Sequence, residues 1–374
     1  MRFSWQRAVA GFVFCVTACA VAAPVELAKF TGLASCQSSL CHGGGAGNNQ
    51  CAIWSSVDFH VRAYAILVTP RSRGITDALH SMTPALNDRC TVCHSPFQPL
   101  PNDRVMPAAR ADESVSCEAC HGPASNWLRS HTRMDYTYAQ KVASGMTDLR
   151  GSYGRANTCV ACHEYLDPAL AKAGHPELIF ELDSQTVSEP PHWKETDPWI
   201  GLHAWLAGQA VAFREDTWHV LKGAPGSGAR WEALGWVLEE AAGGVDGLPA
   251  FAMPQGAIKA GQLADLEAGS DRLARSAASF AWTTGDARHL LQRLASTGAG
   301  LRRLDGTDRQ VHRAEVLVQA MDRLVVELNN HGVTMPGAAQ GLDALFADVR
   351  TPEEFSADQF ARDLDHFSAS VGRL

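Results

Sequence analysis

The second half of the chain has the one-sided apolar periodicity of helices. From about residue 196, apolar residues recur every three or four positions, most clearly in three stripes at 263–280, 311–328 and 360–371. "TDRQ" (307–310) predicts a capping box for the second stripe, and "HG" (331–332) predicts its end. "TPEE" (351–354) predicts the start of the last helix.

Gly- and Pro-rich turns at 223–228, 243–256 and 332–341 separate these helices. We therefore predict a helical bundle over 196–374, in which the apolar stripes form a core and no cofactor site. Residues 36–163 lack long amphipathic periods and are rich in loops. The predicted fold class is mainly α: a loop-rich domain over 23–195 followed by the bundle.

Composition narrows the class of protein. Hydrophobic residues make up 46% of the chain and charged residues 19%, which is typical of a folded globular protein. The net charge of −8 argues against nucleic acid as a partner.

The N-terminus resembles an export signal. Arg2 and Arg7 precede an apolar core at 8–22, and "AVA" (20–22) fits a cleavage site for a signal peptide over 1–22. "VTAC" (16–19) also fits a lipoprotein box with Cys19 as the lipidated residue, and both alternatives stay open. Either predicts a periplasmic protein, which contacts a membrane only if Cys19 is lipidated.

The cysteines are the strongest chemical signal. Of the 11 cysteines, six form three CxxCH motifs at 90–94, 117–121 and 159–163, and two form CxxxxCH at 36–42. CxxCH attaches c-type haem, because two thiols bond the porphyrin and the adjoining histidine binds its iron. The predicted attachment residues are Cys36, Cys41, Cys90, Cys93, Cys117, Cys120, Cys159 and Cys162. The predicted proximal ligands are His42, His94, His121 and His163, which implies four covalently attached haems c.

Two other interpretations of these cysteines are weaker. A Cys₄ zinc site or a disulfide framework fits the cysteine spacing, but neither explains a histidine directly after every pair. Cys51 has no partner in this scheme and is interpreted as a buried free thiol, with an intermolecular disulfide as the alternative.

The sixth ligand decides between an electron carrier and a catalyst, because an iron with two protein ligands cannot bind a substrate. His60, His80, His131, His175 and His192 are the candidate distal ligands nearest the motifs. More remote candidates are His203 and His219, and Met82 and Met106 are methionine alternatives. His289, His312, His331 and His366 are interpreted as structural or solvated.

Several segments together resemble exported multihaem cytochromes related to the cytochrome c-554 type, a tetrahaem electron carrier. The resemblance covers residues 30–195 and rests on "SCQSSLCHG", "SCEACHGPASNWLRSH", "AGHPELIFEL" and "PPHW". It implies closely packed haems with distal ligands exchanged between them. On this basis His131 serves the first haem (His42) and His60 serves the third (His121).

The resemblance also implies that His175 and His192 serve the second and fourth haems, but it does not say which histidine serves which haem. His131 follows His121 by ten residues and His175 follows His163 by twelve. If the second pair copies the first, His175 crosses to the second haem, and His192 or His80 completes the fourth.

Two functions are compatible with these motifs. The favoured one is electron transfer between redox partner proteins, such as other cytochromes or a quinol-linked or extracytoplasmic oxidoreductase, through mostly bis-histidine haems. The alternative is a multihaem oxidoreductase acting on a small nitrogen or sulfur compound at a five-coordinate haem. Arg129, Arg133 and Asp135 lie beside a motif and are candidates to line such a site.

The motifs predict four haems per chain. The pyridine haemochrome absorbance, divided by the protein concentration, should give four, and the same sample should show no high-spin iron. A count of three would contradict the prediction, and the CxxxxCH motif would be the first site to doubt.

Overall fold

The computed structural model describes residues 27–45, 47–223, 228–256 and 258–372, and almost all regular structure there is helical. A single parallel bridge between Phe30 and Val105 is the only β-pairing among these residues. The predicted mainly α fold is therefore confirmed. The predicted signal peptide and Cys19 lie outside the described residues.

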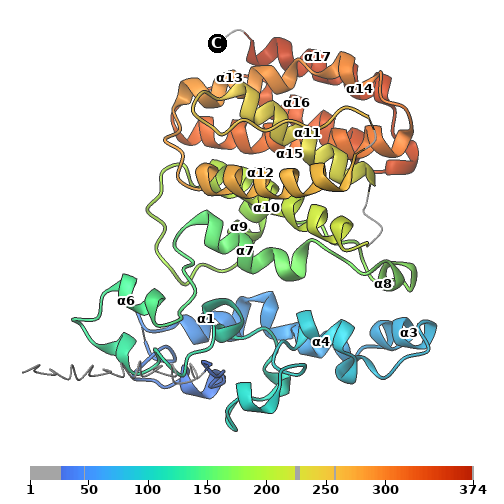
Figure 1. Cartoon of the computed structure of the whole chain (residues 1–374). Helices are drawn as coiled ribbons and strands as arrows, with labels where there is room; N and C mark the ends of the chain where they lie inside the picture. Colours follow the sequence, from blue (N-terminus) through green and yellow to red (C-terminus); the bar gives the residue numbers. More distant parts are fainter. Residues whose placement is uncertain (1–26, 46, 224–227, 257, 373–374) are drawn as a thin grey trace, which may run out of the picture.

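Residues 27–150 form a loop-rich N-terminal lobe, the lower part of Figure 1. Its α-helices are short: α1 (Gln50–Val57), α2 (Ala63–Leu67), α3 (Pro70–Ala78), α4 (Asp88–His94), α5 (Cys117–His121) and α6 (Tyr138–Ala143). Single turns of 3₁₀ helix connect them: η1 (Leu33–Ser35), η2 (Phe59–Arg62), η3 (Pro84–Leu86), η4 (Asn102–Arg104), η5 (Ala111–Glu113) and η6 (Ser130–Thr132).

Residues 151–372 form a helical C-terminal lobe, the upper part of Figure 1. It begins with α7 (Ser152–His163), α8 (Pro168–Lys172) and α9 (Leu182–Ser188). The longer helices α10 (Ile200–Leu221), α11 (Gly228–Gly244), α12 (Ala260–Ala277), α13 (Thr284–Ala295) and α15 (Thr307–Asn330) follow. The lobe is completed by α14 (Gly298–Leu301), α16 (Ala338–Val349), η7 (Pro352–Glu354) and α17 (Ala357–Val371).

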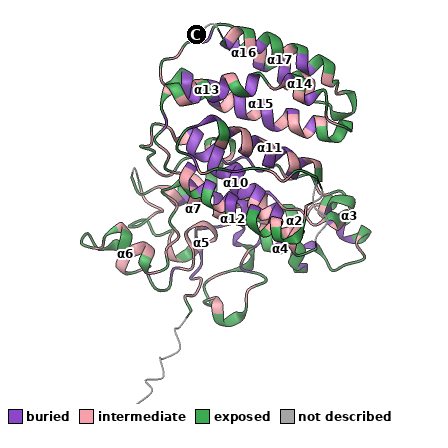
Figure 2. Ribbon diagram, turned by 45° about the horizontal axis from the view of Figure 1, so that its top comes forward, coloured by how far each residue is buried: buried purple, intermediate pink, exposed green. Residues whose placement is uncertain are grey.

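Helix α10 is the centre of the C-terminal lobe. Its residues 201–213 are all buried (Figure 2), because α7, α9, α11, α12 and α15 pack against it. A helix that is apolar all round has no one-sided stripe, so the periodicity of the sequence did not reveal it. Among the helices that the structure describes, none combines the length and the apolarity needed to cross a membrane.

The apolar core of the bundle extends across the domain boundary expected at residue 195. Ala156 and Val160 of α7, together with Phe180 and Leu182, belong to the same core as the bundle helices. Gly208 of α10 allows α9 to approach, since a Cβ at that position would lie 2.8 Å from the Leu182 Cβ. The helix that ends in the last CxxCH motif is thus built into the bundle.

The N-terminal lobe has little apolar core of its own. Only six of its described apolar side chains are buried: Cys51, Leu67, Ile75, Phe97, Ala124 and Trp127. Two buried carboxylates stabilise it instead, because Glu118 accepts hydrogen bonds from the backbone N–H groups of Thr31, Gly32 and Ala124, and Glu113 accepts one from Leu33. Glu118 lies inside the third haem motif, so the segment leading to the first motif is anchored on the third.

The predicted helices are present, but two predicted N-terminal caps are wrong. Helix α15 begins at Thr307 after Gly306, with no side-chain cap, so "TDRQ" does not form the expected capping box. Pro352–Glu354 form a 3₁₀ turn, and Ser356 caps α17 instead, through Oγ to the Gln359 N–H. Phe280 lies beyond the end of α12. The cap of α15 lies one residue from the expected position, and the cap of α17 lies five residues from it, differences that local sequence alone does not determine.

A buried carboxyl on α10 predicts pH-dependent stability. Asp216 is 7% exposed, and burial, reinforced by Glu164, raises its pKa to about 8. Arg230 forms an ion pair with Glu164, in which Arg230 Nε lies 3.1 Å from Glu164 Oε1. The folded protein therefore holds a proton on Asp216 that the unfolded chain, with an Asp pKa near 3.9, releases.

Because the folded state binds more protons, the free energy of unfolding should fall as pH rises from about 4 to about 8, by up to about 1.4 kcal/mol per pH unit. Asp216→Asn, which mimics the protonated carboxyl, should flatten this slope. Urea unfolding followed by circular dichroism at several pH values measures it, and an unchanged slope in the variant would contradict the prediction.

Candidate functional site

The three CxxCH motifs all lie at helix ends. The motif at 90–94 forms most of α4, the motif at 117–121 is the whole of α5, and the motif at 159–163 ends α7. In a helix, residues i and i+3 share a face, so both thiols of a motif point to the same side. The histidine follows directly, where the helix stops.

The CxxxxCH motif reaches a comparable arrangement by a tight turn. The His42 N–H donates to the Cys36 carbonyl at 3.2 Å, and the Cys41 N–H donates to the Ser38 carbonyl at 2.8 Å. The two extra residues are accommodated inside this turn. We refer to the motifs at 36–42, 90–94, 117–121 and 159–163 as the first to fourth sites.

Each motif histidine faces a second histidine from elsewhere in the chain. The ring centroids are 6.1 Å apart for His42 and His131 and for His60 and His163, and 6.3 Å apart for His94 and His175 and for His121 and His192. Rings in direct contact lie much closer, as in the stack of Tyr165 on His219 at 3.5 Å.

This separation is the one that two imidazoles take on opposite sides of one metal ion. A histidine nitrogen binds a first-row metal at about 2.0 Å and lies about 1.1 Å from its ring centre, so two coaxial ligands have centroids about 6.2 Å apart. All four pairs match this distance within 0.1 Å. The histidine set therefore fits four bis-histidine haems.

Hydrogen bonds at Nδ1 leave Nε2 available for iron in six of the eight histidines. Nδ1 of His42 lies 3.0 Å from Gln50 Oε1, and Nδ1 of His60 lies 3.0 Å from Asp58 Oδ1. In three other histidines, Nδ1 lies at hydrogen-bond distance from a backbone carbonyl oxygen. These carbonyls belong to Ala63 for His94, Leu128 for His131 and Pro176 for His175. Metal-binding histidines usually have such a partner, which sets the tautomer and the ring orientation.

The sixth contact involves the side-chain amide of Gln185, whose oxygen and nitrogen can be assigned in two ways. The Gln185 amide nitrogen lies 3.3 Å from His163 Nδ1, and its buried Oε1 has no hydrogen-bond partner among the described residues. With Nε2 on iron, His163 carries its proton on Nδ1 and needs an acceptor there. Turning the Gln185 amide over would let Oε1 accept from His163 Nδ1, at the loss of the 3.4 Å hydrogen bond from the amide nitrogen to the Ile179 carbonyl.

Burial keeps the motif residues in the protonation states that haem attachment needs. Burial, with His192 and His42 nearby, lowers the pKa of His121 to about 4, so its imidazole is neutral at pH 7. Burial also raises the pKa of Cys120 to about 12 and that of Cys159 to about 11. Haem c forms uncharged thioethers by adding two thiols to its vinyl groups, which suits these buried sulfurs.

Three of the four histidine pairs join the two lobes. His60, His94 and His121 belong to the N-terminal lobe, and their partners His163, His175 and His192 belong to the C-terminal lobe. We call the surface along which these pairs lie the interlobe seam. In Figure 1 it runs between α1 and α4 below and α7, α8 and α9 above. Only the first pair, His42 and His131, lies within one lobe.

Contacts between thiols define the order of the sites along the seam. Cys117 of the third site lies close enough to Cys36 of the first to raise the pKa of the Cys36 thiol, and Cys162 of the fourth site does the same to Cys93 of the second. Cys120 of the third site lies within charge interaction of Cys159 of the fourth. The spatial order is therefore first, third, fourth, second.

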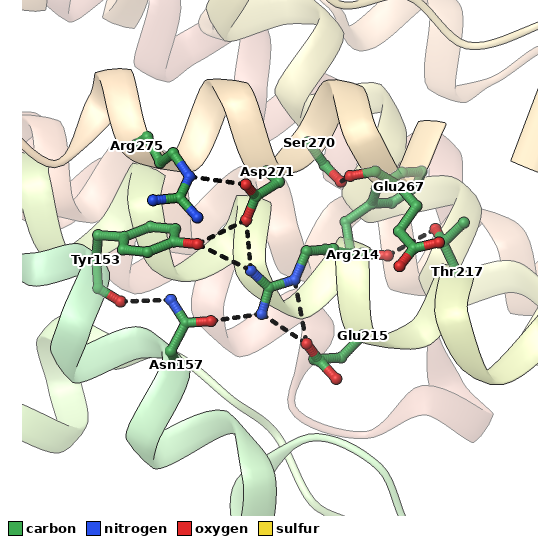
Figure 3. Close-up of polar contacts among 10 residues, drawn as sticks. Tyr153, Asn157, Arg214, Glu215, Thr217, Glu267, Ser270, Asp271 and Arg275 are labelled. Carbon is green, nitrogen blue, oxygen red and sulfur yellow. Dashed lines mark hydrogen bonds and ion pairs between the residues drawn. The ribbon is translucent and has the colours of Figure 1, made fainter. Parts of the chain in front are cut away.

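A polar network fixes α7, the helix of the fourth site, to the bundle (Figure 3). Arg214 of α10 donates to Asn157 of α7 at 2.5 Å and to Asp271 of α12 at 2.6 Å. The Tyr153 hydroxyl donates to the same Asp271 at 2.7 Å, and Arg275 lies over the Tyr153 ring. The position of His163 is thus set by three helices.

The structure corrects two of the expected pairings. His60, expected opposite His121, lies opposite His163, and His192 lies opposite His121. The third and fourth sites are neighbours, so a histidine entering between them can face either, and sequence spacing does not choose. His131 lies opposite His42 and His175 opposite His94, as expected, while iron binding by these pairs remains a prediction.

The other candidate ligands take no part in these pairs. His80 is exposed with a φ of 48°, Met82 and Met106 are exposed, and His203 is buried between Asp197 and the Phe280 carbonyl. Arg133 and Asp135 form an exposed ion pair, which argues against a role in a distal pocket. Cys51 is a buried free thiol on α1, as interpreted from the sequence.

Comparison with known proteins identifies part of the chain. The family model described as cytochrome c7 and related cytochrome c matches residues 77–165, which include the second, third and fourth sites. No curated protein and no solved structure matches. The family match shows a multihaem c-type cytochrome domain, whose haem c is covalently attached.

The pairing predicts which haem each distal histidine serves. The rings of His42 and His131 are nearly parallel, at 14°, whereas those of His60 and His163 are perpendicular, at 90°. A low-spin ferric haem whose two histidine planes are parallel gives a rhombic EPR signal. A haem whose two histidine planes are perpendicular gives a signal with a large maximum g value.

His60→Ala should therefore abolish one large-g signal and create one high-spin iron. His131→Ala, the matched control, should abolish the rhombic signal instead. If His60→Ala left every iron low-spin, or removed the rhombic signal, the assignment of His60 to the fourth site would be wrong.

Proposed function

We propose that this protein is an exported electron carrier that holds four haems c, each between two histidines, and conducts electrons along the interlobe seam. The cytochrome c7-like match supports multihaem electron transfer. The observation that favours a pure carrier is the presence of a facing histidine at all four sites, 6.1–6.3 Å from the motif histidine. Two protein ligands leave no position for a substrate.

The thiol contacts support a continuous path. They bring the attachment edges of the first and third sites together, and likewise those of the fourth and second, while Cys120 and Cys159 join the two halves. The terminal sites are the first and the second. In Figure 1, α1 and α6 lie at one end of the seam and α3 and α8 at the other. Electrons would enter at one end and leave at the opposite one.

The location and the partners are part of the proposal. The basic, apolar and small-residue regions of residues 1–22 favour export to the periplasm. There the partners would be other redox proteins, docking at the ends of the seam. The C-terminal bundle supplies His163, His175 and His192, so it acts as a scaffold for distal and proximal ligands.

Carbon monoxide tests whether every iron has two protein ligands. The dithionite-reduced wild-type protein should show no change in its Soret band under carbon monoxide. His175→Ala is the positive control: it opens the second site and should bind about one carbon monoxide per chain. Stoichiometric binding by the wild type would contradict the carrier and favour an oxidoreductase with an open haem.

A further inference from the structure

One histidine of the eight has a charged partner. Asp58 lies between α1 and η2 and is 4% exposed. Its Oδ1 accepts hydrogen bonds from the His60 backbone N–H at 2.8 Å and from His60 Nδ1 at 3.0 Å. The carboxylate thus orients the ring and receives its Nδ1 proton at the same time.

The other five hydrogen-bonded Nδ1 groups meet uncharged partners. They are the side-chain amides of Gln50 and Gln185 and the carbonyls of Ala63, Leu128 and Pro176. A second carboxylate, Glu189, also lies near His60: ligand atoms of Asp58, His60 and Glu189 all fall within 4.8 Å of one another. Asp58 therefore places a carboxylate behind the distal ligand of the fourth site, while burial and the neighbouring Asp58 raise the pKa of Glu189.

A buried carboxylate acts on a histidine ligand in two ways. It draws the Nδ1 proton toward itself, which makes Nε2 a stronger donor to the metal. Its charge also acts through a medium that screens less than water does. Both effects stabilise ferric over ferrous iron, and hydrogen bonding around a ligand is a known means by which proteins set a haem potential.

We propose that Asp58 is a positioning residue that orients His60 and gives the fourth haem the lowest reduction potential of the four. This inference rests on the proposed ligation of that haem by His60 and His163. Because the fourth site lies between the third and the second, the lowest potential would fall in the interior of the path. An electron would then reside on the other three haems and pass through the fourth haem only briefly.

The test is an EPR-monitored redox titration of the full holoprotein. The large-g signal that disappears in His60→Ala identifies the fourth haem. Asp58→Asn keeps an acceptor oxygen but removes the charge. We expect the fourth haem of this variant to stay low-spin. The equilibrium constant for reduction of that haem should rise about tenfold, which corresponds to a reduction potential about 59 mV higher for one electron. The first and second potentials should stay unchanged, whereas the third should shift in the same direction by a smaller amount, because Asp58 also lies near His192.

The reciprocal variant is Gln50→Glu, which places a carboxylate on His42 Nδ1. The rhombic signal of the first haem should then titrate at a lower potential, by a smaller amount because Gln50 is only half-buried. Four unchanged potentials in Asp58→Asn, with all irons low-spin, would overturn the proposal. So would an unchanged first haem in Gln50→Glu. Failure of the underlying ligation is distinguishable, because the wild-type fourth haem would then be high-spin.

Discussion

The pairing of histidines from the two lobes is the constraint on which this structure depends. The N-terminal lobe buries six apolar side chains, too few to form a stable core for 124 residues, whereas the C-terminal lobe has an extensive apolar core. Four porphyrins would supply the missing apolar surface. Three of the four histidine pairs span the lobes, so haems bound as proposed would also hold the lobes together.

This dependence explains the division of roles between the lobes. The bundle positions α7 through an apolar face and through the Arg214 network, and it presents His163 from a helix end that three helices hold in place. The N-terminal lobe places its motifs on short helices linked by tight turns and on buried carboxylates such as Glu118. A helical frame on one side and short segments on the other place each of the four sites beside the next.

The sequence predicted the chemistry better than the geometry. CxxCH is a local motif, so the eight cysteines and the four motif histidines could be read directly from it. The periodic stripes predicted α12, α15 and α17, but α10 was missed because it is buried on every side. The caps of α15 and α17 were misplaced because a glycine and a later serine end the preceding loops.

The distal ligands show where sequence reasoning stops. His131 and His175 were expected opposite His42 and His94 and lie there, whereas His60 and His192 exchange places. The exchange involves two neighbouring sites whose thiols, Cys120 and Cys159, interact. Which of two adjacent irons a histidine meets depends on how the lobes dock, and that is a tertiary property with no local signal.

Anomalous X-ray scattering at the iron edge, from crystals of the oxidised holoprotein, tests the central claim most directly. The account predicts four iron peaks per chain, in the spatial order first, third, fourth, second, with three of them between histidines of different lobes. A peak with a single histidine ligand at the second, third or fourth site, or an iron bound by two histidines of the same lobe there, would contradict it.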